Sequence, residues 1–161
     1  MAKNEEGILI QDAEIMWPNF SGTETAFNPA GKRNFTVILT PEMEEALTRD
    51  GWNVGTWTPK DEEEEPRPKL KVKVRFDIKP PNVVLVTSST RVPLTEDTIG
   101  QLDHMDIKRW DLFITPYDYD FQGNSGRTAY LKTMFAVLDE NELEAMWARE
   151  PLGQPEGWSA P

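Results

Sequence analysis

The chain has 161 residues, of which 38% are hydrophobic, so it is long enough for one domain with a real core. It has no cysteine, which excludes disulfides, cysteine-ligated zinc and thiol catalysis. No stretch approaches the ~20 apolar residues of a membrane span, and the start of the chain does not resemble a signal peptide, so we expect a cytoplasmic protein with no membrane partner.

The first half of the chain predicts two strands followed by a helix. Apolar residues alternate with polar ones over Ile8–Trp17 and again over Lys32–Leu39, as in half-buried strands. Thr40–Pro41 then combines a good N-cap with a proline at the first helical position, and Gly51 is a plausible helix end. Trp52–Thr58 predicts a short strand or an ordered loop.

The segment Lys69–Phe76 alternates basic and apolar residues at all of its positions. Because a strand sends successive side chains to opposite faces, the apolar residues would face a core and the basic ones would form one cationic stripe. Like charges along one face repel each other, and a polyanion lying across the strand would offset that repulsion. The stripe, which comprises Lys69, Lys71, Lys73 and Arg75, therefore indicates a nucleic-acid ligand.

Most of the net charge of −11 lies in two segments. Asp61–Glu65 holds five acids within a proline-containing loop at 60–68, and residues 139–161 hold six, so the rest of the chain has 17 acids and 16 bases. A nearly neutral body can carry a basic groove, because local potential steers a ligand. Two interpretations of the loop stay open: a solvated surface loop, or a mobile acidic segment that covers the stripe when no ligand is bound.

The second half of the chain predicts mostly strands. Val83–Thr87 is short and β-branched, and Thr95 resembles another helix start. Arg109–Phe121 and Arg127–Leu138 form two long strands around a loop at Gln122–Gly126. These elements predict a mainly β fold, most economically an antiparallel barrel with inserted helices.

The C-terminal segment differs from the body in composition. Asp139 and Glu142 resemble a capping box at the start of a short helix. The last ten residues are rich in proline and glycine and are predicted to be disordered. The sequence thus predicts a nucleic-acid-binding domain at 1–138 and an acidic helix with a disordered tail at 139–161.

The two long strands also carry the residue types that bind single-stranded nucleic acid, which needs cations for phosphates and aromatic faces for bases. Tyr117 and Tyr119 would share one face of the hairpin, with Asp118 and Asp120 on the other. Any one aromatic residue is more often part of a core. A Tyr-Asp-Tyr-Asp run near a hairpin tip is nevertheless more polar than a core strand.

Enzymatic interpretations are weak. The one histidine, His104, fits a helix-end surface position better than a metal site. Asp118 and Asp120 could form the metal pair of a nuclease, a minor alternative that lacks an assignable third acid. The chain has neither a glycine-rich phosphate loop nor a Gly-x-Ser-x-Gly elbow. We therefore expect no enzymatic activity, no metal and no cofactor.

Two parts of the chain resemble phage single-stranded-DNA-binding proteins of the OB-fold type. The first part is Trp17–Phe20 with Phe27–Asn28 and then Gly31–Pro41. The second part is Asp111–Ile114, Pro116–Tyr119, Gly126–Lys132 and the closing Val137. The resemblance covers about two-thirds of the chain. It implies an OB-like barrel with a helix between strands and a short C-terminal helix. It also implies non-specific binding of single strands in phage replication or recombination, and an acidic tail that contacts replication enzymes and competes with DNA.

The predicted function is to coat and protect single-stranded DNA, and the expected interface is built from basic and aromatic residues. The basic residues are Lys32, Arg33, Lys69, Lys71, Lys73, Arg75, Arg127 and Lys132; the aromatic residues, some of which would stack on bases, are Trp17, Phe20, Trp110, Tyr117, Tyr119 and Tyr130. The alternative is an acidic interaction protein, either a DNA mimic or an adaptor for a basic partner, which would bind no oligonucleotide.

Overall fold

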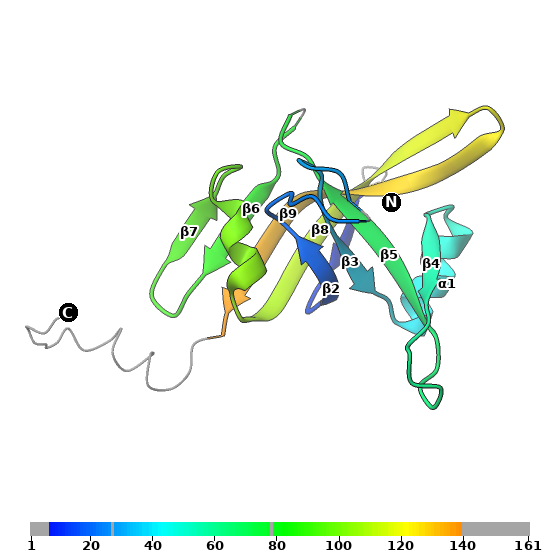
Figure 1. Cartoon of the computed structure of the whole chain (residues 1–161), viewed down its shortest axis with the longest axis horizontal. Helices are drawn as coiled ribbons and strands as arrows, with labels where there is room; N and C mark the ends of the chain where they lie inside the picture. The colour runs from blue at the N-terminus through cyan, green and yellow to red at the C-terminus, as the bar shows by residue number, and fades with distance from the viewer. Residues whose placement is uncertain (1–6, 27, 78, 140–161) are drawn as a thin grey trace, which may run out of the picture.

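The computed structural model describes residues 7–26, 28–77 and 79–139, and these form a mainly β structure (Figure 1). The strands are β1 Ile8–Ile10, β2 Glu14–Asn19, β3 Arg33–Ile38, β4 Val54–Trp57, β5 Arg67–Val74, β6 Asn82–Val86, β7 Arg91–Leu94, β8 Ile107–Phe121 and β9 Asn124–Leu138; the helices are α1 Pro41–Arg49 and the 3₁₀ helix η1 Ile99–His104. The predicted mainly β class is confirmed. The expected C-terminal helix lies outside the described residues.

All described strands belong to one sheet of nine, whose main path runs β1-β8-β9-β5-β3-β2. Neighbours on this path are antiparallel except for β9 and β5, which are parallel. Strand β6, which lies off this path, also pairs in parallel with β9. In the described part of the chain, β1 and β2 at the two ends of the path do not pair with each other, so the expected closed barrel is not confirmed.

The two ends of the sheet are nevertheless joined by the chain itself. Only Gln11–Ala13 separates β1 from β2, and Asp12 adopts a left-handed conformation with φ 53°. The Ala13 amide then donates to the Trp110 carbonyl at 2.8 Å. The segment therefore turns sharply from its partner β8 to its partner β3.

Helix α1 begins and ends as its sequence predicts. The Thr40 side chain accepts a hydrogen bond from the Met43 amide at 3.2 Å, and Pro41 occupies the first turn. Gly51 follows the helix with φ 89°, a left-handed conformation that glycine adopts without a Cβ clash. The helix is followed directly by β4, which pairs with the start of β5.

The core lies against one face of β3 and β5. Phe35, Val37, Leu70, Val72 and Val74 are buried, and each strand alternates with residues that point to the opposite face. The alternation read from the sequence of β5 is therefore confirmed: its apolar side chains pack inward and its lysines lie outside.

The β8–β9 hairpin is longer than predicted, because its turn contains only Gln122 and Gly123 instead of five residues. Their φ values of 52° and 84° are those of a two-residue turn that matches the strand twist. Figure 1 shows the hairpin projecting beyond the rest of the sheet. Strand β7 was not predicted, and the helix expected at Thr95 is the short 3₁₀ helix η1.

Candidate nucleic-acid interface

The lysines of β5 occupy the outer face of the sheet between β3 and β9. Lys71 lies opposite Thr36 and Lys73 opposite Asn34 on β3, while Lys73 also lies beside Tyr130 on β9. Lys71 and Lys73 are exposed and Lys69 is half-buried. Among the described residues, no carboxylate forms an ion pair with any of these three lysines. Their positive charges are therefore available to an anion from outside.

Two tryptophans lie at the Lys69 end of this face. A register shift in β2 and a left-handed conformation (φ 52°) turn Trp17 outward, where half of it is exposed. Its ring meets that of Trp57 edge-on at a centroid distance of 6.0 Å, and the Lys69 Nζ lies 5.6 Å from the Trp17 ring centroid. The sequence analysis did not include Trp57 in the expected interface. The alternation of Thr56 and Trp57 in a predicted strand could have indicated that the two side chains point to opposite faces.

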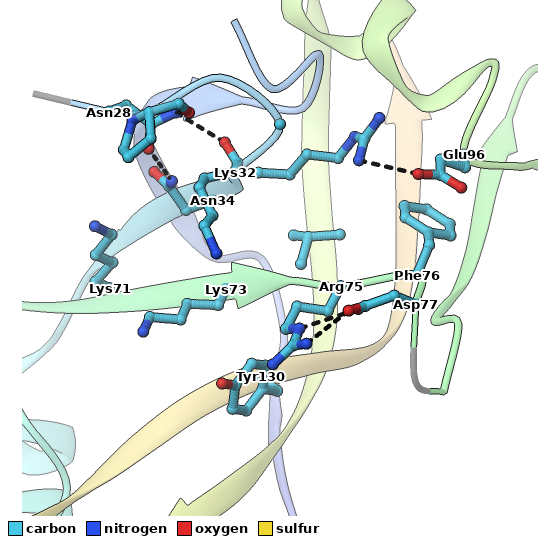
Figure 2. Close-up of a pocket in the computed structure, with 14 residues that line it drawn as sticks. Asn28, Lys32, Asn34, Lys71, Lys73, Arg75, Phe76, Asp77, Glu96 and Tyr130 are labelled. Carbon is cyan, nitrogen blue, oxygen red and sulfur yellow. Dashed lines mark hydrogen bonds and ion pairs between the residues drawn. The ribbon is translucent and has the colours of Figure 1, made fainter. Parts of the chain in front are cut away.

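An open pocket of about 480 Å³ lies at the other end of the face (Figure 2). Lys71 and Lys73 lie on one side of it, and Asp77 and Glu96 lie on the other. Tyr130 forms part of the lining, and Asn34 donates from Nδ2 to Asn28 Oδ1 at 2.9 Å at the rim. The cationic face therefore ends in a concave site with polar walls.

Arg75 follows β5 directly and lines this pocket. Its guanidinium donates to both carboxylate oxygens of Asp77, from Nε at 3.0 Å and from Nη2 at 2.6 Å. This contact lowers the pKa of Asp77 and raises that of Arg75, to which the Tyr130 hydroxyl also contributes. Both groups of the pair are therefore charged at neutral pH.

The hairpin continues the same face with aromatic rings. Residues 115, 117, 119 and 121 of β8 point to the side on which Tyr130 lies, because Thr115 and Tyr130 are paired. Tyr117 and Tyr130 contact each other edge-on at 6.0 Å, and Tyr117 is 59% exposed. The Tyr119 hydroxyl accepts a hydrogen bond from Asn53 at 3.2 Å, and Phe121 near the tip is 68% exposed.

Arg127 lies on the opposite face of the hairpin and is bound within the protein. Its guanidinium donates to Asp118 at 2.6 Å and to Asp50 at 3.0 Å, and lies 5.9 Å from the Trp52 ring centroid. The contact lowers the pKa of Asp118. Arg127 therefore links the hairpin to the end of α1. The described residues contain no group of three acids or histidines placed to hold a metal ion.

Phe20 and Trp110, predicted as stacking residues, pack against each other. Their rings are stacked at 5.7 Å with an interplanar angle of 19°, and Phe20 is completely buried. Arg33 is also engaged: its Nε donates to the Phe20 carbonyl at 3.0 Å, and its Nη1 lies 3.4 Å from Glu96. Lys32 lines the pocket, whereas Lys132 is exposed at the register shift of β9 and is not among the lining residues.

The acidic segment Asp61–Glu65 is exposed in the connection from β4 to β5. Figure 1 shows this connection projecting from the start of β5, at the end opposite the pocket. Within the described part of the chain, none of the five acids is ion-paired with a lysine of β5. The loop thus leaves the lysine face uncovered in this structure.

Comparison with known proteins gives the family. The sequence model of the family described as "Putative phage ssDNA-binding domain" matches residues 1–156. The chain belongs to this family. The resemblance to phage single-stranded-DNA-binding proteins is thus confirmed, and with it the predicted function of single-stranded-DNA binding. A search of the curated proteins finds no match.

Solved structures show the same fold at low sequence identity. The truncated single-stranded DNA-binding protein from bacteriophage Enc34 is 9% identical, with a TM-score of 0.54 over 85% of this chain and 88% of the other. The same phage protein in complex with ssDNA is 8% identical, with a TM-score of 0.54 over 85% and 89% of the two chains. A third structure, of the Enc34 single-stranded DNA-binding protein, is 10% identical, with a TM-score of 0.52 over 97% of this chain and 89% of the other.

No helix among the described residues is long and apolar enough to cross a membrane.

Proposed function

We propose that this protein coats single-stranded DNA, without sequence preference, during phage replication or recombination, and that the strand lies across the outer face of β5. One observation carries the proposal. Three aligned lysines without carboxylate partners among the described residues lie between tryptophans at one end and tyrosines at the other. Cations for phosphates and rings for bases are the two parts of a single-strand site.

The path of the strand follows from which side chains remain available. Phosphates would contact Lys69, Lys71 and Lys73, with Lys32 and Arg75 at the pocket. Bases would stack on the exposed rings of Trp17, Tyr117 and Tyr119 and on the half-buried ring of Tyr130. Contacts to phosphates carry no sequence information and stacking tolerates every base, so little sequence preference is expected. Binding of this kind involves no reaction, and we propose no enzymatic role.

We further propose that the sheet acts as an OB-type barrel whose joint is the turn between β1 and β2. The strand order and the parallel pairing of β5 with β9 support this, as does the short Gln11–Ala13 link between the two ends of the sheet. An OB fold is a five-stranded, partly open barrel that binds oligonucleotides on one face. An experimental structure in which β1 does not pair with β8, or β2 does not pair with β3, would contradict the barrel.

The test is a titration of tryptophan fluorescence with oligo-dT at about 50 and about 200 mM salt. We expect quenching at low salt that fades at high salt, because each phosphate contact contributes about −0.7 to the log–log slope for single strands. A response that is equally strong with duplex DNA would contradict the preference for single strands. Absence of any response would favour the alternative of an acidic adaptor or DNA mimic, which the net charge of −11 supports.

We also propose that residues 139–161 form an acidic tail that competes with DNA for this face and contacts replication or recombination enzymes in the host cytoplasm. The six acids of this segment support the proposal. A chain ending at Asp139 should bind oligo-dT more tightly than the full chain. Equal affinity of the two chains would contradict competition by the tail.

A further inference from the structure

The pocket at the end of the lysine face contains two kinds of cation. Arg33 and Arg75 each contact a carboxylate that also lines the pocket, whereas Lys32, Lys71 and Lys73 form no ion pair with a carboxylate in the described ranges of the chain. Five cationic side chains thus share the site with two acidic ones, Asp77 and Glu96. The excess of positive charge favours an anionic ligand.

The two arginine–carboxylate pairs differ in how firmly they are built into the fold. Arg33 has 18% of its side chain exposed and also donates to the Phe20 carbonyl, so its position depends on the core. Arg75 has 44% of its side chain exposed and Asp77 has 65%. Exposed ion pairs contribute little net stability. The Arg75–Asp77 pair can therefore exchange partners at small cost, whereas the Arg33 pair is structural.

The geometry of the Arg75–Asp77 contact is that of phosphate recognition. Two N–H groups of the guanidinium donate in parallel to two oxygens of one anion, at 3.0 and 2.6 Å. Arginine binds phosphate through the same bidentate fork. Arg75 lines the pocket, and Figure 2 shows its fork between the ring of Tyr130 and the carboxylate of Asp77. The Asp77 carboxylate thus occupies the place that a phosphate group would take.

We propose that this pocket binds a backbone phosphate of single-stranded DNA and that Asp77 is a built-in competitor, which holds the Arg75 fork until the phosphate replaces it. The proposal rests on the proposed function and assigns a role to a residue that carries the same negative charge as the ligand. Lys71 and Lys73 attract the phosphate, and Arg75 changes partner from Asp77 to the ligand. The competitor lowers the affinity for DNA and keeps the Arg75 fork ordered when DNA is absent.

The test compares Asp77→Asn with Asp97→Asn in a titration with an oligo-dT of about 16 nucleotides, the upper range for one OB fold. Asp97 is exposed, follows Glu96 in the sequence and does not line the pocket, so it controls for the loss of one negative charge nearby. We expect Asp77→Asn to bind about threefold to fivefold more tightly than the wild type, which is the upper part of the range expected of an exposed ion pair. Asp97→Asn should change the affinity by less than twofold.

A double-mutant cycle identifies the partner of Asp77. Arg75→Gln should weaken binding more in the Asp77→Asn background than in the wild type, because Arg75 is fully available to phosphate only when Asp77 is removed. Asp77→Ser serves as a second variant, and the far-UV spectrum and melting temperature of each variant confirm that it is folded.

Each outcome decides the proposal. Equal affinity of Asp77→Asn and wild type, or a gain matched by Asp97→Asn, overturns it. Weaker binding by Asp77→Asn also overturns it and makes Asp77 a positioning residue for Arg75. If neither the wild type nor the variants bind oligo-dT, the proposed function fails as well. Binding by wild type without a gain in Asp77→Asn rejects the competitor alone.

Discussion

The lysines on the outer face of β5 and the arginines around them make opposite use of positive charge. Lys69, Lys71 and Lys73 have no carboxylate partner among the described residues, whereas Arg127 is held by Asp118 and Asp50 and Arg67 is held by Glu14. A guanidinium suits a fixed, bidentate contact, while an ammonium on a flexible stem suits a ligand whose position varies. In the proposed interface, Arg127 and Arg67 therefore hold the fold, whereas the three lysines are left for the DNA.

The largest effect on DNA affinity is expected when the three lysines of β5 are replaced. Replacing Lys69, Lys71 and Lys73 together with glutamine should lower the affinity for oligo-dT on the order of 100-fold, because three charge-assisted contacts are lost. The salt dependence should become shallower by about 2 in the log–log slope. Titrations at several salt concentrations measure both, and an unchanged slope would show that the phosphates lie elsewhere.

The comparison is sharpened by testing an aromatic ring beside the lysines. Tyr117→Ala should weaken oligo-dT binding about tenfold, since stacking contributes ~1–3 kcal/mol per base. Val92→Ala, at an exposed apolar position on β7, is the matched control and should bind normally. Fluorescence anisotropy with labelled oligo-dT measures the two affinities. Equal binding by both variants would remove Tyr117 from the site.

The arginine side of the comparison should respond in stability instead of affinity. Arg127→Gln removes the ion pairs to Asp118 and Asp50 and the contact with Trp52, and should lower the free energy of unfolding by about 1 kcal/mol. Urea denaturation measures this change. The affinity for oligo-dT should change less than twofold, and a large loss of affinity in a variant of normal stability would break the comparison.

The smallest effect is a dependence of stability on acid pH. The pKa of Asp118 is lowered in the folded protein by Arg127, so the pair contributes stability above the ordinary aspartate pKa of about 4 and loses it as the pH falls through the lowered value. Asp118→Asn should therefore lose stability less steeply than wild type over this acid range. Parallel slopes in urea denaturation at several pH values would contradict the assignment.

Local patterns predicted what depends on one segment alone. The alternation of β5, the cap at Thr40 and the turn at Gly51 each follow from a few neighbouring residues, and the structure has all three. The partners of Arg127 did not follow, because Asp50 lies 77 positions away in the sequence. Phe20 and Trp110 likewise come from segments far apart in the sequence, so neither segment alone predicts that their rings stack on each other.

The hairpin turn shows a different limit. The sequence Gln122–Gly126 offers several turn residues in succession, and the strands could have been closed at more than one register. Pairing of Phe121 with Asn124 selects the shortest turn and adds Asn124, Ser125 and Gly126 to β9. Pairing thus continues to the end of β8, where the ring of Phe121 is 68% exposed.

The pairing of β1 with β8 bears on the order in which the chain folds. Ile8 lies opposite Ile114, so more than half of the chain separates the partners, whereas β8 and β9 are joined by two residues. Closing the longer loop costs more conformational entropy, so we expect the hairpin to form early and β1 to dock late. Pulse-labelled hydrogen exchange would follow the protection of each strand. On the ribosome, β1 is synthesised before the other described strands and would therefore be among the last of them to find its partner.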